Sequence, residues 1–239
     1  DEIKRAKSKQ PHLSTINFQD DSFLALPYDQ LQDFAKLYKE QVKIPFVVCG
    51  VIPNYVREDK IALLVEAGMN RVRMGIQSGS DNILEFYKRP TKLHRIKEAT
   101  EILYKFRKYM IPPAYDIILE NPVEKANDTR ATVDMLYEMP RPYTINVYAL
   151  RVIPNTLLAK DIEDRGLKVP PIDKNYAAGY HRTLGNILVF ALVVWKMPRW
   201  IFKILRKKVY PVHEKQASYP ILFWLTRMTY LIKRAYNHL

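Results

Sequence analysis

The stretch Asn70–Asp81, NRVRMGIQSGSD, decides the fold, because a strand pattern runs there into a glycine-rich turn and a helix start. Gly75 and Gly79 allow the backbone to approach a ligand closely. Gln77 and Ser78 supply neutral donors and acceptors that suit hydroxyls and amides. An ordinary strand–turn–helix junction explains the same spacing at least as well, so the stretch predicts an α/β unit and leaves ligand binding open.

The same alternation continues on both sides of that stretch, through residue 167. It predicts strands over 13–19, 45–51, 70–76, 113–119 and 144–152, and helices over 28–40, 56–67, 91–110, 128–139 and 156–165. Thr91 is the expected N-cap of the helix with the clearest apolar stripe, and Ser80 or Asp81 caps the helix after the turn. Such spacing predicts parallel strands with right-handed crossovers, in an open doubly wound sheet or in a barrel.

Polar residues gather where each predicted strand ends, which is where parallel α/β folds bind their ligands. These residues are Asp20, Asp21, Asn54, Gln77, Ser78, Glu120, Asn121, Arg151 and Asn155. Ordinary loop polarity explains Asn54 and Asn155 well. It does not explain Asp116, which lies inside an apolar strand and therefore needs a partner.

Charge divides the chain into two regions. Of 38 Lys and Arg, 13 lie in 168–239, where Asp173 and Glu214 are the only acids, so this part carries +11 and residues 1–167 carry +2. We expect an α/β domain over 1–167 and a basic, aromatic-rich helical region over 168–239, divided near Pro170-Pro171. The apolar share of 48% argues against wholesale disorder.

Several segments taken together resemble the radical S-adenosylmethionine superfamily, above all its members with an N-terminal cobalamin-binding domain. The segments are INFQDDSF, EAGMNRVRMGIQSGSDNILEFYKRPT, YDIILENPVE and LRVIPNTLLA. The resemblance covers residues 1–167. It implies a partial TIM-like barrel of six β/α units, of which this chain lacks the first.

The activity implied by the resemblance is radical chemistry. A [4Fe–4S] cluster binds S-adenosylmethionine and cleaves it to a 5′-deoxyadenosyl radical, or supports cobalamin-dependent methyl transfer. We expect an apolar small molecule as substrate, which is methylated, cyclised or rearranged. A tRNA-modifying radical enzyme is a less favoured alternative.

The resemblance also implies roles for the two charged ends of the cofactor's methionyl group. Asp20 or Asp21 matches the acid that lies near the amino group, and Arg89 matches the arginine that pairs with the carboxylate. A guanidinium can hold a carboxylate with two hydrogen bonds. Taken by itself, Arg89 could equally be a cation at the C-terminus of a short helix.

The ribose side of the cofactor has its own expected partners. By the same resemblance, Gln77 and Ser78 match the polar positions that meet the ribose or methionyl end, and Asp116 matches an acid that holds the ribose hydroxyls. A diol suits a carboxylate or an amide.

The cluster ligands of the family are missing. The family holds its cluster with three cysteines in a CxxxCxxC loop, whereas Cys49 is the only cysteine here and lies on a later strand. We expect the ligands to lie outside this chain, in a longer protein of which this is an inactive piece. The alternative is a degenerate barrel without a cluster that serves as a scaffold or as a membrane-associated partner. The five histidines have no metal-ligand spacing.

The last 64 residues mix apolar runs with cations. The run ILVFALVVW over 187–195 has about half of the ~20 apolar residues that a membrane span needs. Trp, Phe and Leu mixed with Lys and Arg suit a lipid headgroup surface, and helices packed under the barrel explain the pattern equally well. A single cysteine fits a reducing compartment. We expect a cytoplasmic protein that could contact the inner face of the membrane.

Overall fold

The computed structural model describes residues 2–20, 22–89, 91–150, 152–167, 181–211, 213–214 and 217–237. Its strands are β1 (Ile16–Phe18), β2 (Phe46–Val51), β3 (Met69–Gln77), β4 (Ala114–Leu119) and β5 (Thr144–Ala149). The helices of the first part are α1 (Glu2–Lys9), α2 (Tyr28–Gln41), α3 (Glu58–Glu66), α4 (Asp81–Phe86), α5 (Leu93–Lys105), α6 (Ala126–Glu138) and α7 (Leu157–Asp164). Those of the C-terminal part are α9 (Leu184–Val194), α10 (Arg199–Arg206) and α11 (Pro220–Tyr236).

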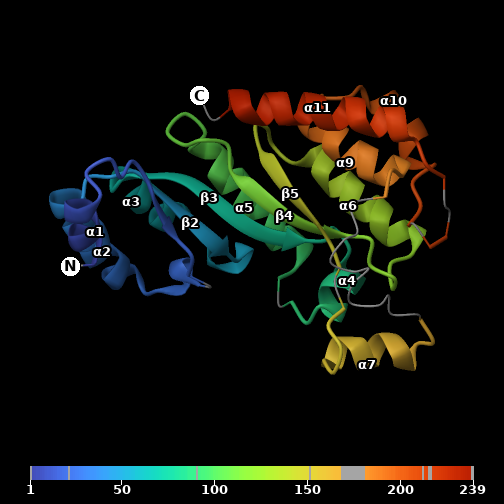
Figure 1. The fold of residues 1–239 in the computed structure, drawn as a ribbon, viewed down its shortest axis with the longest axis horizontal. Coiled ribbons are helices and arrows are strands. Elements are labelled where there is room, and N and C mark those ends of the chain that lie inside the picture. Colours follow the sequence, from blue (N-terminus) through green and yellow to red (C-terminus); the bar gives the residue numbers. More distant parts are fainter. Residues whose placement is uncertain are drawn as a thin grey trace.

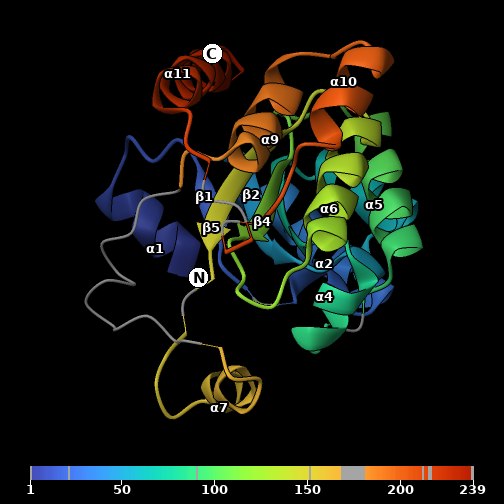
Figure 2. The same ribbon diagram turned by 90° about the vertical axis from the view of Figure 1, so that its right-hand side faces the viewer.

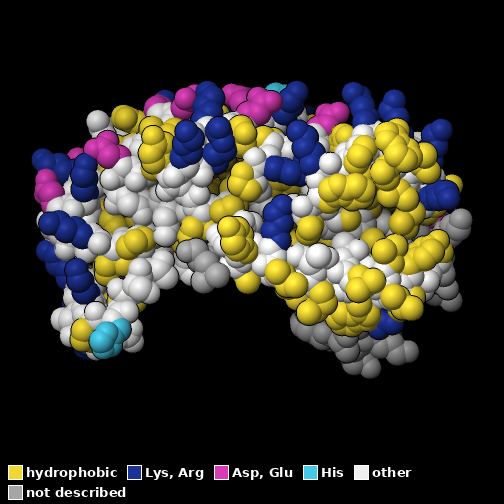
Figure 3. Space-filling model, turned by 90° about the horizontal axis from the view of Figure 1, so that it is seen from above, with side chains coloured by type: hydrophobic (Ala, Val, Ile, Leu, Met, Phe, Trp, Pro, Cys, Tyr) yellow, Lys and Arg dark blue, Asp and Glu magenta, His cyan; other side chains and the backbone are white. Residues whose placement is uncertain are grey.

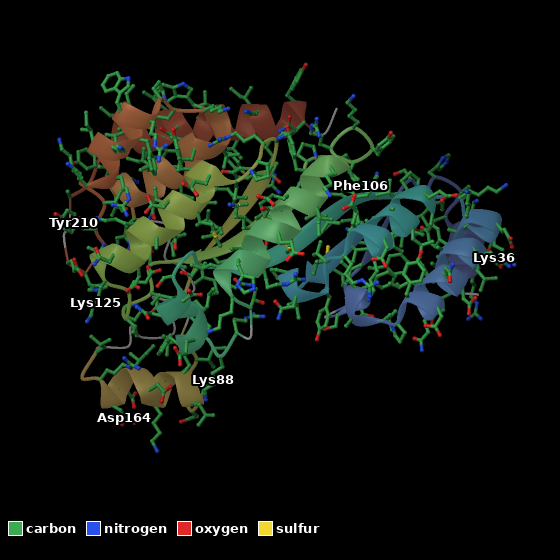
Figure 4. The ribbon with its side chains drawn as sticks, turned by 180° about the vertical axis from the view of Figure 1, so that it is seen from behind. Lys36, Lys88, Phe106, Lys125, Asp164 and Tyr210 are labelled. Atoms are coloured by element: carbon green, nitrogen blue, oxygen red, sulfur yellow. The ribbon has the colours of Figure 1, made fainter. Side chains whose placement is uncertain are left out.

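The five strands form one parallel sheet in the order β1-β2-β3-β4-β5. Each crossover therefore moves one strand further in the same direction, as in a β/α barrel, whereas a doubly wound sheet reverses its order. The helices α3, α5 and α6 cover one face of this sheet (Figures 1 and 4). The molecule is an arch, and Figure 3 shows it hollowed on one side. The predicted partial barrel is thus confirmed.

Side chains alternate between the two faces of the strands. On β3, Val72, Met74 and Ile76 are buried in the main hydrophobic cluster, and the residues between them are half-buried. Since neighbouring residues of a strand point to opposite faces, Arg71 and Arg73 lie on the face away from that cluster. The apolar side chains of the strand pack against the helices, and the polar side chains face the hollow.

One predicted helix cap is wrong, and the other is right in position but makes no capping hydrogen bond. The helix α5 begins at Leu93 after Lys92, so its N-cap is not Thr91, which is buried. Ser80 does occupy the N-cap position of α4, but its side chain makes no cap hydrogen bond. The Ser80 hydroxyl donates instead to Asp128 Oδ1 at 2.6 Å. At the start of α4, a tertiary contact has replaced local capping.

The C-terminal helices pack on the barrel. α9 lies between α6 and α11 (Figure 2), and eight of its eleven residues are buried. Its Phe190 packs edge-on against Phe223 of α11, with ring centroids 6.2 Å apart. These residues share the hydrophobic cluster of the sheet. The predicted boundary at residue 167 adjoins 168–180, which lie outside the described residues.

On the outer edge of β5, one side chain satisfies both backbone groups of a residue. The Tyr230 hydroxyl of α11 donates to the Ile145 carbonyl at 2.5 Å and accepts from the Ile145 amide at 3.3 Å. Ile145 would otherwise expose both backbone groups along the last strand. Among the helices described, none is both long and apolar enough to cross a lipid bilayer.

Candidate functional site

The face of the sheet that lines the hollow of the arch is called the hollow face below. A charged pair lies in its middle. Arg73 on β3 donates through Nε to both carboxylate oxygens of Asp116 on β4, at 3.0 and 2.9 Å. The Asp116 side chain is 17% exposed and that of Arg73 is 35% exposed. Hydrogen bonding to Asp116 raises the pKa of Arg73, so its guanidinium stays charged. Arg73 is therefore the partner that the charge of Asp116 requires inside this apolar strand.

Two side chains of β5 extend this pair into a polar band. Asn146, the register partner of Asp116, donates through Nδ2 to Asp116 Oδ1 at 2.8 Å. Arg73 also donates from Nη2 to the hydroxyl of Tyr148, which is exposed. Asp116 is therefore held from both neighbouring strands, and its orientation is set before any ligand arrives.

The band continues toward the amino ends of the strands. Arg71 donates from Nη2 to Thr144 Oγ1 at 2.9 Å. Burial lowers the pKa of Arg71, and the charge of Arg234 on α11 adds to the effect. Burial also raises the pKa of the Cys49 thiol on β2, with Arg73 acting in the opposite sense. Cys49 is thus a buried neutral side chain beside the band.

Gln77 lies on the same side of the sheet as Asp116. It ends β3 with a φ of +72° and pairs in register with Ile117, next to Asp116. A Cβ added to Gly75 would lie 2.6 Å from Gln77 Nε2. The side-chain amide of Gln77 therefore folds back over Gly75, and a larger residue at position 75 would displace this flexible amide.

Ser78 and Gly79 contact a helix. Ser78 is fully buried, with its hydroxyl 3.2 Å from Thr132 Oγ1 on α6. A Cβ on Gly79 would lie 2.5 Å from the Thr132 Cα. The expectation that Gly79 lets the backbone approach a ligand is corrected: the approach is to α6. The expected ligand contact of Ser78 stays a prediction.

The remaining expected residues lie on exposed loops. Asp20 follows β1, is exposed, and accepts a hydrogen bond from the Ser22 amide at 3.2 Å. Asp21 and Arg151 lie outside the described residues. Arg89 is exposed in the loop after α4, next to Lys88, which Figure 4 labels at the molecular edge. The structure places Gln77 and Asp116 on neighbouring strands. The expected ligand roles of both, like those of Asp20, Asp21 and Arg89, stay predictions.

A second polar cluster lies beyond the end of β4. Glu120 accepts hydrogen bonds from the backbone amide of His181 and from Asn186 Nδ2, both at 2.7 Å. Glu124, four residues on, is buried, and burial raises its pKa to about 8, helped by the negative charge of Asp128. These contacts tie the loop at the carboxyl end of the sheet to the start of α9.

Sequence reasoning missed most of this network. Arg71 and Arg73 alternate along NRVRMGIQ with the apolar residues of β3, and that period of two is the signal that could have placed them on the ligand side. Asn146 and Tyr148 have the same spacing in TINVYA. The pairing of Arg73 with Asp116 depends on strand register, which this sequence does not reveal.

The described residues fit only part of the expected cofactor set. No group of three His, Cys, Asp or Glu among them could hold a metal ion, and the one cysteine is buried in the sheet. This chain therefore does not fit an iron–sulfur cluster. It does fit a polar ligand with hydroxyls, because Asp116 Oδ2 has acceptor capacity beyond the single bond from Arg73 described above.

Comparisons with known proteins bear on the family and the fold. Residues 1–136 match the profile of the Radical SAM superfamily. No curated protein matches the chain.

Three solved structures show the same fold. OxsB, a cobalamin-dependent S-adenosylmethionine radical enzyme, superposes with a TM-score of 0.59 at 16% identity, over 99% of this chain and 41% of its own. The radical S-adenosylmethionine methyltransferase TsrM from Kitasatospora setae gives 0.55 at 16%, over 70% and 32%. The coproporphyrinogen III oxidase HemN from Escherichia coli gives 0.52 at 18%, over 68% and 37%.

These identities support a shared fold, and the chain spans less than half the length of each of the three proteins. The superfamily profile, by contrast, covers more than half of the chain. It includes β1 to β4 and therefore both Gln77 and Asp116. The protein belongs to the radical S-adenosylmethionine superfamily.

Proposed function

We propose that this chain is the S-adenosylmethionine-binding barrel of a cobalamin-dependent enzyme that acts on an apolar small molecule. Support for the cofactor comes from superfamily membership. Support for cobalamin comes from similar structures, because TsrM carries cobalamin and a [4Fe-4S] cluster, and OxsB carries aqua-cobalamin and S-adenosylmethionine. The choice of an apolar substrate rests on the apolar and basic composition of the C-terminal region.

The observation that carries the proposal is the paired and oriented Asp116 on the hollow face. Arg73 and Asn146 hold the carboxylate from the two neighbouring strands. A ribose diol donates two hydroxyls, and a fixed carboxylate accepts them without having to be ordered first. Gln77 adds an amide at the carboxyl end of the same sheet, where it can bind the ribose or methionyl part.

Bound S-adenosylmethionine would supply a sulfonium whose C5′–S bond can be cleaved after one-electron reduction. In the proposal, the chain's own residues bind and orient it. Asp116 and Gln77 take the nucleoside side, Arg89 pairs with the methionyl carboxylate, and Asp20 or Asp21 lies near the amino group. A zwitterionic amino acid needs one anion and one cation, and these loops offer both. Arg89 is exposed, so it has room to turn toward a ligand.

The cluster is assigned to another part of the protein. Because the described residues do not fit it, the proposal places its cysteine ligands in a segment outside these 239 residues. One observation favours a second candidate, a scaffold without radical chemistry: Cys49 is the only cysteine and lies on a later strand. Sequence upstream of Asp1 separates the two candidates, since a CxxxCxxC loop there supports the enzyme and its absence supports the scaffold.

Activity of the longer protein tests the proposal directly. After anaerobic cluster reconstitution and reduction, the protein is expected to release 5′-deoxyadenosine or S-adenosylhomocysteine from S-adenosylmethionine, measured by mass spectrometry. The Asp116→Asn variant should lose at least about tenfold of this activity, because it loses the negative charge and one of the two acceptor oxygens. Asp164→Asn, an exposed change at the end of α7, is the control. An intact cluster with no cleavage would overturn the proposal.

A further inference from the structure

The outward surfaces of α10 and α11 carry large apolar side chains that the rest of the chain does not cover. Along α11, Ile221, Leu225, Met228, Ile232 and Tyr236 follow one another at helical spacing and are 52–77% exposed. On α10, Trp200 and Ile204, one turn apart, are 66% and 52% exposed. Figure 3 shows these helices under a broad apolar patch at one end of the molecule. We name this set of residues the α10–α11 face.

The helix α11 is apolar on both sides. Its inner side buries Phe223 and Tyr230 against α9 and β5, where they are 4% and 3% exposed. Its outer side exposes Leu225 and Ile232 to 64% and 66%. A surface helix ordinarily turns polar residues outward, and contiguous apolar patches of this kind mark interaction sites. Packing within the fold explains the apolar residues on the inner side of α11. The apolar residues on its outer side indicate a partner outside this chain.

The charges around the face select the kind of partner. Lys196, Arg199 and Lys203 are exposed beside it, and Figure 3 shows cations at its border. The sequences of α9, α10 and α11 contain no Asp or Glu. A second copy of the chain would bring like charges together. An anionic lipid surface offers apolar depth and negative charge in one plane.

The three tryptophans of the chain support the same partner. Trp195, Trp200 and Trp224 are 48%, 66% and 52% exposed and lie on or beside this face. Indole rings favour the boundary between lipid tails and water, since one edge is apolar and the N–H still bonds to polar groups. The helices α10 and α11, with 8 and 17 residues, fall short of a membrane span. Both helices also contain Arg and Lys, which suits a position along the membrane surface.

We propose that the α10–α11 face docks the protein on an anionic membrane surface, with α10 and α11 lying in the plane of the lipid headgroups. The contact does not depend on the radical chemistry. A protein without cofactor or cluster would bind the membrane equally, so this proposal and the proposed function can fail separately.

Vesicle binding tests the proposal, with the tryptophans as the probe. Flotation and tryptophan emission are measured with phosphatidylcholine vesicles and with vesicles that contain about 30% phosphatidylglycerol. With the anionic vesicles we expect flotation and a blue shift of the emission. Binding should be on the order of tenfold stronger than with neutral vesicles and should weaken as salt is raised, because several cations contribute. No flotation and no shift with anionic vesicles would overturn the proposal.

Paired variants locate the contact. Leu225→Ser combined with Ile232→Ser should lower vesicle binding about tenfold, whereas Leu37→Ser, at a 52% exposed position on α2, should leave it unchanged. Arg199→Gln with Lys203→Gln should remove the preference for anionic lipid, and Lys36→Gln on α2 is the charge control. Equal binding by all variants would overturn the proposal. So would a dimer, detected by sedimentation without lipid, that the serine variants convert to monomer.

Discussion

The hollow face of the sheet and the α10–α11 face depart from ordinary burial in opposite directions. On the hollow face, charged side chains are partly buried in a parallel sheet, and Asp116 is hydrogen-bonded to Arg73 and Asn146. On the α10–α11 face, residues such as Leu225 remain in water. The first arrangement costs desolvation and the second leaves apolar surface uncovered. We propose a ligand for each, a cofactor on the hollow face and a lipid surface on the α10–α11 face.

The largest expected effect separates the two sides of α11. Phe223→Ala should lower the free energy of unfolding by about 4 kcal/mol, because it removes a buried ring packed on Phe190. Leu225→Ala, two residues away on the outer side, should change it by less than about 0.5 kcal/mol. Urea denaturation of both variants gives the comparison. An equally large loss for Leu225→Ala would mean that the outer side is buried in solution.

A buried carboxyl beyond β4 should make stability depend on pH. Burial raises the pKa of Glu124 from 4.5 to about 8, so the folded protein keeps a proton that the unfolded chain has released. Raising the pH from 5 to 7 should therefore lower the free energy of unfolding by about 2.5 kcal/mol relative to Glu124→Gln, which cannot ionise. Urea denaturation at several pH values measures this difference. Identical pH profiles would contradict the burial of Glu124.

The charged pair of the hollow face should show coupling. Arg73→Met leaves the Asp116 carboxylate without its cation in a partly buried site and should cost about 2 kcal/mol. The double variant with Asp116→Asn should cost less than the sum of the single variants, because both charges are then absent. A double-mutant cycle from urea denaturation provides the coupling. Additive effects would show that the two side chains do not interact in solution.

The smallest effect concerns the edge of β5. Tyr230→Phe removes the hydroxyl that bonds both backbone groups of Ile145 and should cost about 1 kcal/mol. Tyr236→Phe, which alters an exposed ring on the outer side of the same helix, should cost close to nothing. Hydrogen exchange of the Ile145 amide gives a local readout, and its protection should fall only in Tyr230→Phe.

The fold could be predicted almost element by element. The predicted strands 70–76 and 113–119 correspond to Met69–Gln77 and Ala114–Leu119, because local apolar periodicity determines where such elements lie. The order of the strands, and with it the choice between barrel and doubly wound sheet, is a long-range property that periodicity does not contain. Resemblance to a family supplied that choice, and the sheet order confirms it.

The candidate site could be predicted only in outline. Asp116 could be identified from the sequence as a charge in an apolar strand, and Gln77 as the residue at the end of a strand. Arg73 was not, because its pairing depends on the register between β3 and β4. Gly79 shows the opposite error, since a glycine-rich turn looks the same whether it meets a ligand or a helix such as α6.

Binding of S-adenosylmethionine to the hollow face is tested most directly by equilibrium titration of the longer, cluster-containing protein under anaerobic conditions. We predict that Asp116→Asn raises the dissociation constant by at least about tenfold, since one charged acceptor is lost from the ribose site. Asp164→Asn should bind like the wild type. Equal dissociation constants for all three proteins would contradict the assignment of the hollow face as the cofactor site.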